Sequence, residues 1–80
     1  MPKLPQVVGS ELIHALEKTG FRITRQRGSH VQLRREEADG SVITFPVPVH
    51  SGQPLKKGLL RGILRKAALT PDQLSKLLRK

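Results

Sequence analysis

Residues 21–45 read FRITRQRGSHVQLRREEADGSVITF, and apolar and polar side chains alternate along three parts of this segment. Alternation with a period of two is typical of strands that bury one face. Gly28-Ser29 and Asp39-Gly40 separate the three parts, and both dipeptides favour tight hairpin turns. The segment therefore predicts a three-stranded antiparallel sheet, with strands over residues 21–27, 30–35 and 41–45.

The same alternation assigns the two faces of the sheet. The side chains expected to point inward are Phe21, Ile23, Val31, Leu33, Ile43 and Phe45. Those expected to share the open face are Arg22, Thr24, Gln26, His30, Gln32, Arg34 and Thr44. Because Pro46 and Pro48 cannot donate ladder hydrogen bonds, we expect the third strand to lie at an edge and to end there.

A first helix is expected directly before the sheet. Leu12, Ala15 and Leu16 fall on one face at helical spacing. Ser10 is the expected N-cap, and residues 1–8, which contain two prolines, are expected to form an irregular leader.

Two further helices are expected after the sheet. Residues 56–67 predict a helix whose apolar stripe consists of Leu60, Ile63, Leu64 and Ala67. Thr70 and Gln73 have the spacing of a capping box around Pro71, which predicts a short third helix. The predicted fold is therefore α+β and double-stranded-RNA-binding-domain-like. Its order is α-β-β-β-α with a short C-terminal helix, and the helices lie on one face of the sheet.

The composition restricts the classes of function. Fifteen Lys and Arg against six Asp and Glu give 80 residues a net charge of +9, which favours a polyanion such as nucleic acid as partner. Cysteine is missing, and only two aromatic residues are available to stack on unpaired bases. No apolar run approaches the length of a membrane span, and residues 1–5 lack the apolar core of a signal peptide. We expect a single cytoplasmic domain over residues 1–80.

Histidines are the side chains of this chain that ordinarily titrate near neutrality, and they stand at positions 14, 30 and 50. His30 directly follows Gly28-Ser29 on the expected open face, and Arg25 and Arg27 are close in sequence. An imidazole beside a surface that attracts phosphate is suited to acid–base cleavage of RNA, which requires no metal ion or cofactor. His50 is either a second proton carrier or a structural hydrogen-bonding residue, and His14 is expected to be a solvated surface side chain.

Lys56 and Lys57 stand at the expected start of the second helix, where cations oppose the helix dipole. Together with the unpaired N–H groups of a helix N-terminus they predict a phosphate-binding site. The alternative is that both are flexible surface lysines. Gly58 and Gly62 stand four residues apart inside the same helix and would let another chain approach it closely.

Three motifs follow one another along the chain: Gly28-Ser29-His30, then Pro48-Val49-His50-Ser51-Gly52, then LKKGLLRGIL at residues 55–64. In this order the sequence resembles the HicA family of ribonuclease toxins, the toxin halves of HicA–HicB toxin–antitoxin pairs. The resemblance implies a double-stranded-RNA-binding-like fold, cleavage of translated messenger RNA and an essential histidine at His30. It also implies a HicB-type antitoxin that binds the toxin and covers this site.

Three hypotheses follow for the function. The first is an endoribonuclease with His30 as general acid or base, and Gly28, Ser29, Arg25, Arg27, Lys56 and Lys57 as RNA-binding residues. The second is a non-catalytic RNA-binding module of the same fold, which reads the shape of A-form RNA. The third is a basic docking surface for an acidic protein, without a role for RNA.

Overall fold

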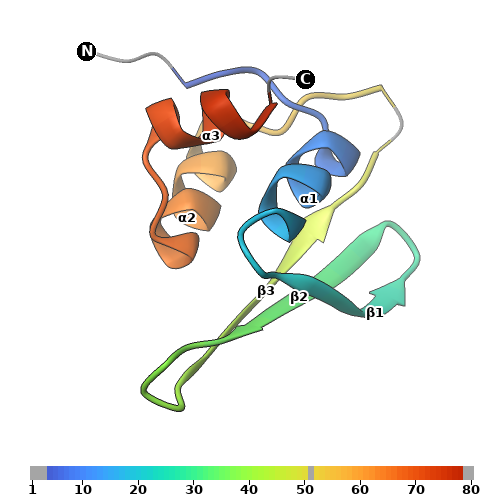
Figure 1. Cartoon of the computed structure of the whole chain (residues 1–80). Helices are drawn as coiled ribbons and strands as arrows, with labels where there is room; N and C mark the ends of the chain where they lie inside the picture. Colours follow the sequence, from blue (N-terminus) through green and yellow to red (C-terminus); the bar gives the residue numbers. More distant parts are fainter. Residues whose placement is uncertain (1–3, 51, 79–80) are drawn as a thin grey trace.

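The computed structural model describes residues 4–50 and 52–78. Its elements are α1 (Gly9–Glu17), β1 (Arg22–Arg27), β2 (His30–Glu36), β3 (Val42–Pro48), α2 (Lys57–Ala67) and α3 (Pro71–Leu78). The strands form one antiparallel sheet in the order β1-β2-β3, and the helices lie together on one side of it (Figure 1). The predicted α+β fold with the order α-β-β-β-α and a short C-terminal helix is therefore confirmed.

The core lies between the sheet and the helices. Its buried side chains are Val7, Leu12, Ile13, Ala15, Leu16, Phe21, Val31, Leu33, Phe45, Val47, Leu60, Ile63, Leu64, Ala67 and Leu74. The Phe21 and Phe45 rings meet there with their centroids 5.1 Å apart and their planes tilted by 56°. This packing leaves the other face of the sheet open, and that face carries the candidate site.

The prediction of the buried face is correct for Phe21, Val31, Leu33 and Phe45, and Ile43 packs against them half-buried. It is wrong for Ile23, whose side chain is 49% exposed. Ile23 lies opposite the fully buried Leu33 and therefore faces the helix side of the sheet, but it belongs to the edge strand β1 and stays accessible to solvent.

A β-bulge in β1 changes which side chains reach the open face. Ile23 pairs with Leu33 and Arg25 pairs with Gln32, so Thr24 is an extra residue in β1. The alternation therefore reverses after Thr24, because the inserted residue shifts all later side chains to the other face. Gln26 lies opposite the buried Val31, so its predicted place on the open face is wrong.

The third strand extends beyond its predicted end at residue 45 and ends at Pro48. β3 continues through Pro46 and Pro48, which lie opposite Gln32 and His30 in β2. An edge strand tolerates proline because alternate N–H groups point away from the sheet. The predicted edge position is correct and the predicted end is wrong; the extension adds the buried Val47 to the core.

The start of α1 also differs from the prediction. Val8, and not Ser10, is the N-cap, and its backbone N–H donates a hydrogen bond to Glu11 Oε1 at 3.2 Å. The helix begins two residues earlier than Ser10 as cap would place it, and its first residue, Gly9, packs directly against β3, where a Cβ would collide with the carbonyl oxygen of Pro48. Thus Gly9 lets α1 approach the end of the sheet that holds His30.

The expected leader of residues 1–8 is partly built into the fold. Val7 is 2% exposed, and its carbonyl oxygen accepts a hydrogen bond from the N–H of Leu55 at 2.8 Å. Val8 forms an isolated antiparallel bridge with Pro54. Residues 4–7 are irregular as expected, although Val7 is part of the core, and only Val8 departs from the expectation; residues 1–3 lie outside the described part of the chain.

The predicted helices after the sheet are confirmed. α2 begins at Lys57 with Lys56 as N-cap, and its predicted apolar stripe is buried. The capping box of α3 forms in both directions: Gln73 N–H donates to Thr70 Oγ1 at 3.1 Å, and Thr70 N–H donates to Gln73 Oε1 at 2.8 Å. Leu74 is fully buried and anchors α3 on the core.

Candidate functional site

One hollow on the open face of the sheet brings together four side chains of β1 and β2. It has a volume of about 230 Å³ and is lined by Arg25, Arg27, His30 and Gln32. The register explains this grouping, because Arg25 lies opposite Gln32 and Arg27 lies opposite His30. Without the bulge at Thr24, both arginines would point to the helix side. The predicted neighbours Arg25, Arg27 and His30 therefore share one surface.

The turn before His30 requires a glycine. Gly28 has a φ of +53°, in the left-handed region that costs other residues free energy, while no atom lies within 4 Å of a Cβ placed there. The carbonyl oxygen of Ser29 accepts a hydrogen bond from the N–H of Val49, so the turn is joined to the segment after β3. This bond holds the β1–β2 turn against the segment after β3, at the end of the sheet where His30 lies.

His30 itself is accessible to solvent. It is the first residue of the central strand β2, with Arg27 as its cross-strand neighbour on one side and Pro48 on the other. Its side chain is exposed and lines the hollow, so a polynucleotide could reach the ring. A group that exchanges a proton with a substrate needs this access.

Gln32 and Thr44 form a hydrogen-bonded pair beside His30. Gln32 Nε2 donates to Thr44 Oγ1 at 2.7 Å, and Thr44 Oγ1 donates to the carbonyl oxygen of Leu33 at 2.8 Å. Thr24 Oγ1 also donates to the carbonyl oxygen of Gln32 at 3.4 Å. Gln32 was not predicted as a site residue, although the alternation of β2 placed it on the open face.

Two further arginines extend the basic surface along the sheet. Arg22 lies opposite Arg34, on the same face as Arg25 and His30. Arg34 makes an ion pair with Glu36 at 3.3 Å, and this pair is solvent-exposed. Sequence reasoning placed both arginines on the open face without assigning them to the site. Two like charges directly opposite each other destabilise a sheet, and a bound anion would compensate for this.

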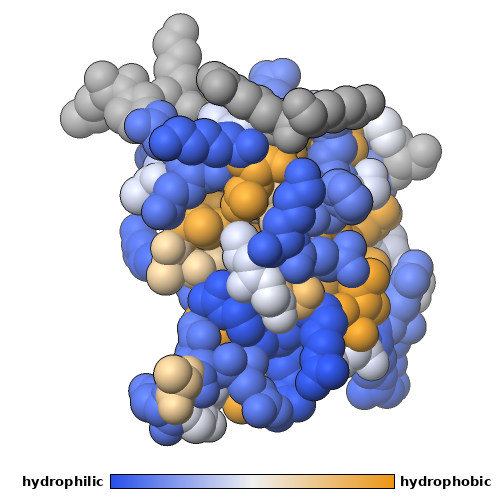
Figure 2. All heavy atoms as spheres, viewed as in Figure 1, coloured by the Kyte–Doolittle hydropathy of each residue, from blue (hydrophilic) through white to orange (hydrophobic). Residues whose placement is uncertain are grey.

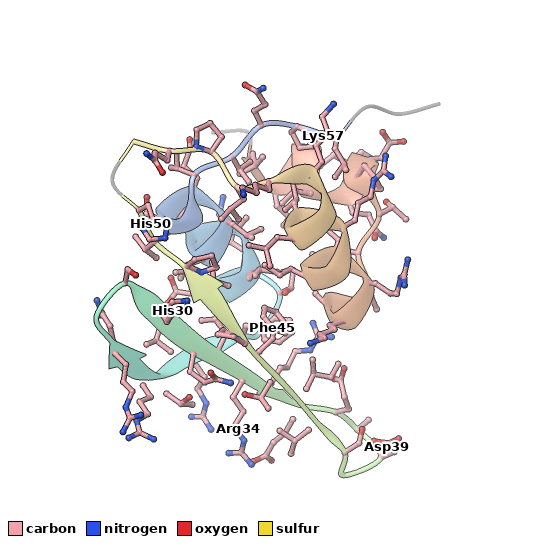
Figure 3. All side chains as sticks on the ribbon, turned by 180° about the vertical axis from the view of Figure 1, so that it is seen from behind. His30, Arg34, Asp39, Phe45, His50 and Lys57 are labelled. Carbon is pink, nitrogen blue, oxygen red and sulfur yellow. The ribbon has the colours of Figure 1, made fainter. Side chains whose placement is uncertain are left out.

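His50 lies at the same end of the sheet as His30. It follows β3 by two residues, and the last residue of β3, Pro48, pairs with His30; Figure 3 shows the two histidines near each other at this end. The His50 side chain is exposed, and its carbonyl oxygen accepts a hydrogen bond from the N–H of Gln53 at 3.1 Å. His50 does not line the hollow, so its role stays a prediction.

Lys56 and Lys57 are not part of the hollow. Both are exposed at the start of α2, and Figure 3 shows Lys57 in the helix layer, well away from His30. No acidic residue lies in the first turn of α2. The positive charges of the two lysines and the positive end of the helix dipole are therefore not offset by a carboxylate on that turn. Their assignment to RNA binding stays a prediction.

Comparison with known proteins identifies the family. The family model described as HicA toxin of bacterial toxin-antitoxin matches residues 9–69. The chain belongs to the HicA toxin family. No curated protein sequence matches it. As a HicA toxin it is the toxin component of a toxin–antitoxin pair, and the matched segment contains the whole sheet, the hollow and α2.

Two carboxylates of the β2–β3 hairpin of this HicA toxin are held by neighbours in the same hairpin. Figure 3 shows Asp39 at the tip of the β2–β3 hairpin, where its Oδ1 accepts hydrogen bonds from Ser41 N–H at 2.8 Å and Ser41 Oγ at 2.6 Å. The side-chain bond from Ser41 and then the backbone bond lower the pKa of Asp39. Glu37 is paired with Arg35 at 2.9 Å. Across residues 4–50 and 52–78, no three His, Cys, Asp or Glu side chains lie together as a metal site would require.

The surface of the HicA toxin differs between the sheet and the helices. Hydrophilic side chains cover most of the lower left part over the β2–β3 hairpin, and hydrophobic atoms show between the helices in the upper part (Figure 2). A second hollow of about 300 Å³ lies between α1 and α3, with the exposed His14 among its lining residues. In the described part of the chain, no helix is long and apolar enough to cross a bilayer.

Proposed function

We propose that this HicA toxin is an endoribonuclease that cleaves messenger RNA, with His30 as general acid or base. The observation that carries the proposal is the exposed position of His30 in a hollow that it shares with Arg25 and Arg27. An imidazole can exchange protons with a substrate, and two guanidinium groups beside it can bind the phosphate that reacts.

The proposed reaction is an internal displacement at phosphorus. The ribose 2′-hydroxyl loses its proton and attacks the adjacent phosphorus, and the bond from phosphorus to the 5′-oxygen breaks as that oxygen gains a proton. Arg25 and Arg27 stabilise the negative charge that develops on the non-bridging oxygens. His30 performs one of the two proton transfers, and His50 or a water molecule performs the other. The chemistry needs no metal ion or cofactor.

The remaining predicted residues would hold the RNA. Gly28 presents only backbone at the turn, with open space where a Cβ would stand, so an RNA backbone can approach it closely; the neighbouring Ser29 is half-buried. Lys56 and Lys57 would contact phosphates farther along the same RNA, because they do not line the hollow. Phosphate contacts of this kind set the affinity and its salt dependence.

The proposal includes neutralisation by a HicB-type antitoxin in the cytoplasm, where messenger RNA is translated. A net charge of +9 favours an acidic partner surface. A partner that covers Arg25, Arg27 and His30 would exclude RNA from the hollow.

A non-catalytic RNA-binding module is the alternative, because the basic open face could bind RNA without cleaving it. Purified wild-type and His30→Ala proteins, incubated with RNA in EDTA and analysed on a sequencing gel, distinguish the two. The proposal expects products from the wild type alone. RNA binding by both proteins without products from either would favour the alternative. The substitution should not disturb folding, because the His30 side chain is exposed.

A further inference from the structure

Three side chains follow one another along the open face of β2: His30, Gln32 and Arg34. Alternate residues of a strand are separated by about 6.6 Å. If an RNA strand binds along β2, one nucleotide would contact His30 and the next nucleotide would contact Gln32. Gln32 also lines the hollow with His30.

The hydrogen bonds of Thr44 determine how the Gln32 amide is oriented. The Thr44 hydroxyl has one proton, and the bond of 2.8 Å to the carbonyl oxygen of Leu33 uses it. Thr44 Oγ1 can then only accept from Gln32, at 2.7 Å, so the amide nitrogen of Gln32 must face Thr44. The amide oxygen Oε1 lies in the same plane as the nitrogen, on the other branch from Cδ, and is left without a bond to Thr44.

This orientation leaves a hydrogen-bond acceptor, Gln32 Oε1, on a residue that lines the hollow beside two arginines. Arg25 and Arg27 can only donate. A phosphate group of RNA offers acceptors alone and therefore satisfies the arginines, but it offers nothing to Gln32 Oε1. The groups of RNA that can donate to this oxygen are the N–H groups of the bases and the ribose 2′-hydroxyl.

We propose that Gln32 Oε1 accepts a hydrogen bond from an N–H or O–H donor of the nucleotide beside the cleaved bond, and that Thr44 is the positioning residue that presents this oxygen. The inference rests on the proposed function, since it assigns Gln32 to RNA bound in the same hollow. It adds selectivity beyond the phosphate contacts, because a contact to a base edge reads sequence and a contact to the 2′-hydroxyl distinguishes RNA from DNA.

The test measures binding without cleavage. Proteins that carry His30→Ala are titrated in EDTA with short RNA oligonucleotides that differ in the base at one position, and with matched oligonucleotides that lack one 2′-hydroxyl. The parent should prefer some of these ligands by about three- to ten-fold, the range of one net hydrogen bond. A preference among bases assigns the donor to a base, and a loss with the 2′-deoxy ligand assigns it to the ribose.

Four variants separate recognition from packing. Gln32→Met keeps the length of the side chain without the acceptor, and Thr44→Val removes the hydroxyl that orients it; both should abolish the preference. Thr44→Ser should retain it, because the hydroxyl remains. Gln26→Met is the matched control, since Gln26 is exposed on the other side of β1, and it should change neither affinity nor preference.

The proposal is overturned if Gln32→Met and Thr44→Val keep the relative affinities of the parent, or if they weaken all ligands equally. It is also overturned if the parent shows no preference or binds no RNA. Cleavage by the wild-type protein is measured separately. A lost preference in Gln32→Met together with an inactive wild type would support the Gln32 contact and contradict the nuclease proposal.

Discussion

Arg27 lies directly opposite His30 in the β1–β2 ladder, and Gly28 and Ser29 form the two-residue turn that joins them. One hairpin therefore holds a cation and an imidazole side by side on the open face. Because the turn is tied to the segment after β3 through the bond from Val49 N–H to the Ser29 carbonyl oxygen, this arrangement is part of the sheet and not of a loose loop.

The arginines of the hollow should dominate RNA binding. Arg25→Ala and Arg27→Ala should each weaken RNA affinity and reduce the slope of log K against log salt by about one, as expected when one phosphate contact is lost. Binding is measured by fluorescence anisotropy over a range of salt concentrations. Arg61→Ala is the control, because Arg61 is exposed on α2 and does not line the hollow. An equal loss from Arg61→Ala would mean that overall charge, and not this surface, binds RNA.

The turn glycine should contribute to stability through its backbone conformation. Gly28→Ala should lower the free energy of unfolding by about 1 kcal/mol, because φ is +53° there although space for the methyl group is open. Gly58→Ala should instead raise it by up to about 1 kcal/mol, since Gly58 lies in α2 with equally open space around it and without a positive φ. Urea denaturation of both variants measures the difference, and shifts of the same sign would contradict it.

Arg35 should stabilise the fold, whereas Arg34 should not. The Arg35 guanidinium carbon lies 4.4 Å from the centroid of the Phe21 ring, and its nitrogens contact the Thr19 carbonyl oxygen at 3.1 Å and Glu37 at 2.9 Å. Removing one partner of such a largely buried network typically costs about 2–4 kcal/mol, so Arg35→Ala should be strongly destabilising. Arg34→Ala should change stability by less than about 0.5 kcal/mol, because its ion pair with Glu36 is exposed. Thermal and urea unfolding compare the pair, and similar losses would refute the assignment.

The hairpin tip should show a lowered Asp39 pKa that depends on Ser41. The pKa in the folded state is below its usual value, so Asp39 contributes to stability above its unfolded pKa, and this contribution is lost as the pH falls through the folded pKa. Ser41→Ala removes the first and largest cause and should raise the Asp39 pKa. An NMR titration of the Asp39 carboxyl carbon in both proteins measures the shift; identical midpoints would contradict the role of the Ser41 hydroxyl.

The sequence was sufficient for the elements and for most of the core. The period of two in residues 21–45 and the apolar stripe of α2 were correctly interpreted, because both depend on local periodicity. The position of His30 on the open face followed from the same alternation. Family membership, indicated by the Gly28-Ser29-His30 motif and those after it, was confirmed by the match over residues 9–69.

Features that depend on tertiary contacts could not be read from the sequence. The bulge at Thr24 has no residue pattern of its own, yet it turns Arg25 and Arg27 toward His30. The start of α1 depends on the close contact between Gly9 and Pro48, which are far apart in the chain. The orientation of Gln32 depends on Thr44 of the neighbouring strand, so only the paired register reveals it.

The most direct test of the central claim is the identity of the RNA ends that the wild-type protein produces in EDTA, compared with His30→Ala. Attack by the 2′-hydroxyl predicts 2′,3′-cyclic phosphate and 5′-hydroxyl ends from the wild type. The His30→Ala protein should keep its fold and should show no cleavage above background. Equal cleavage by His30→Ala, or 5′-phosphate ends from the wild type, would contradict the assignment of acid–base chemistry to His30.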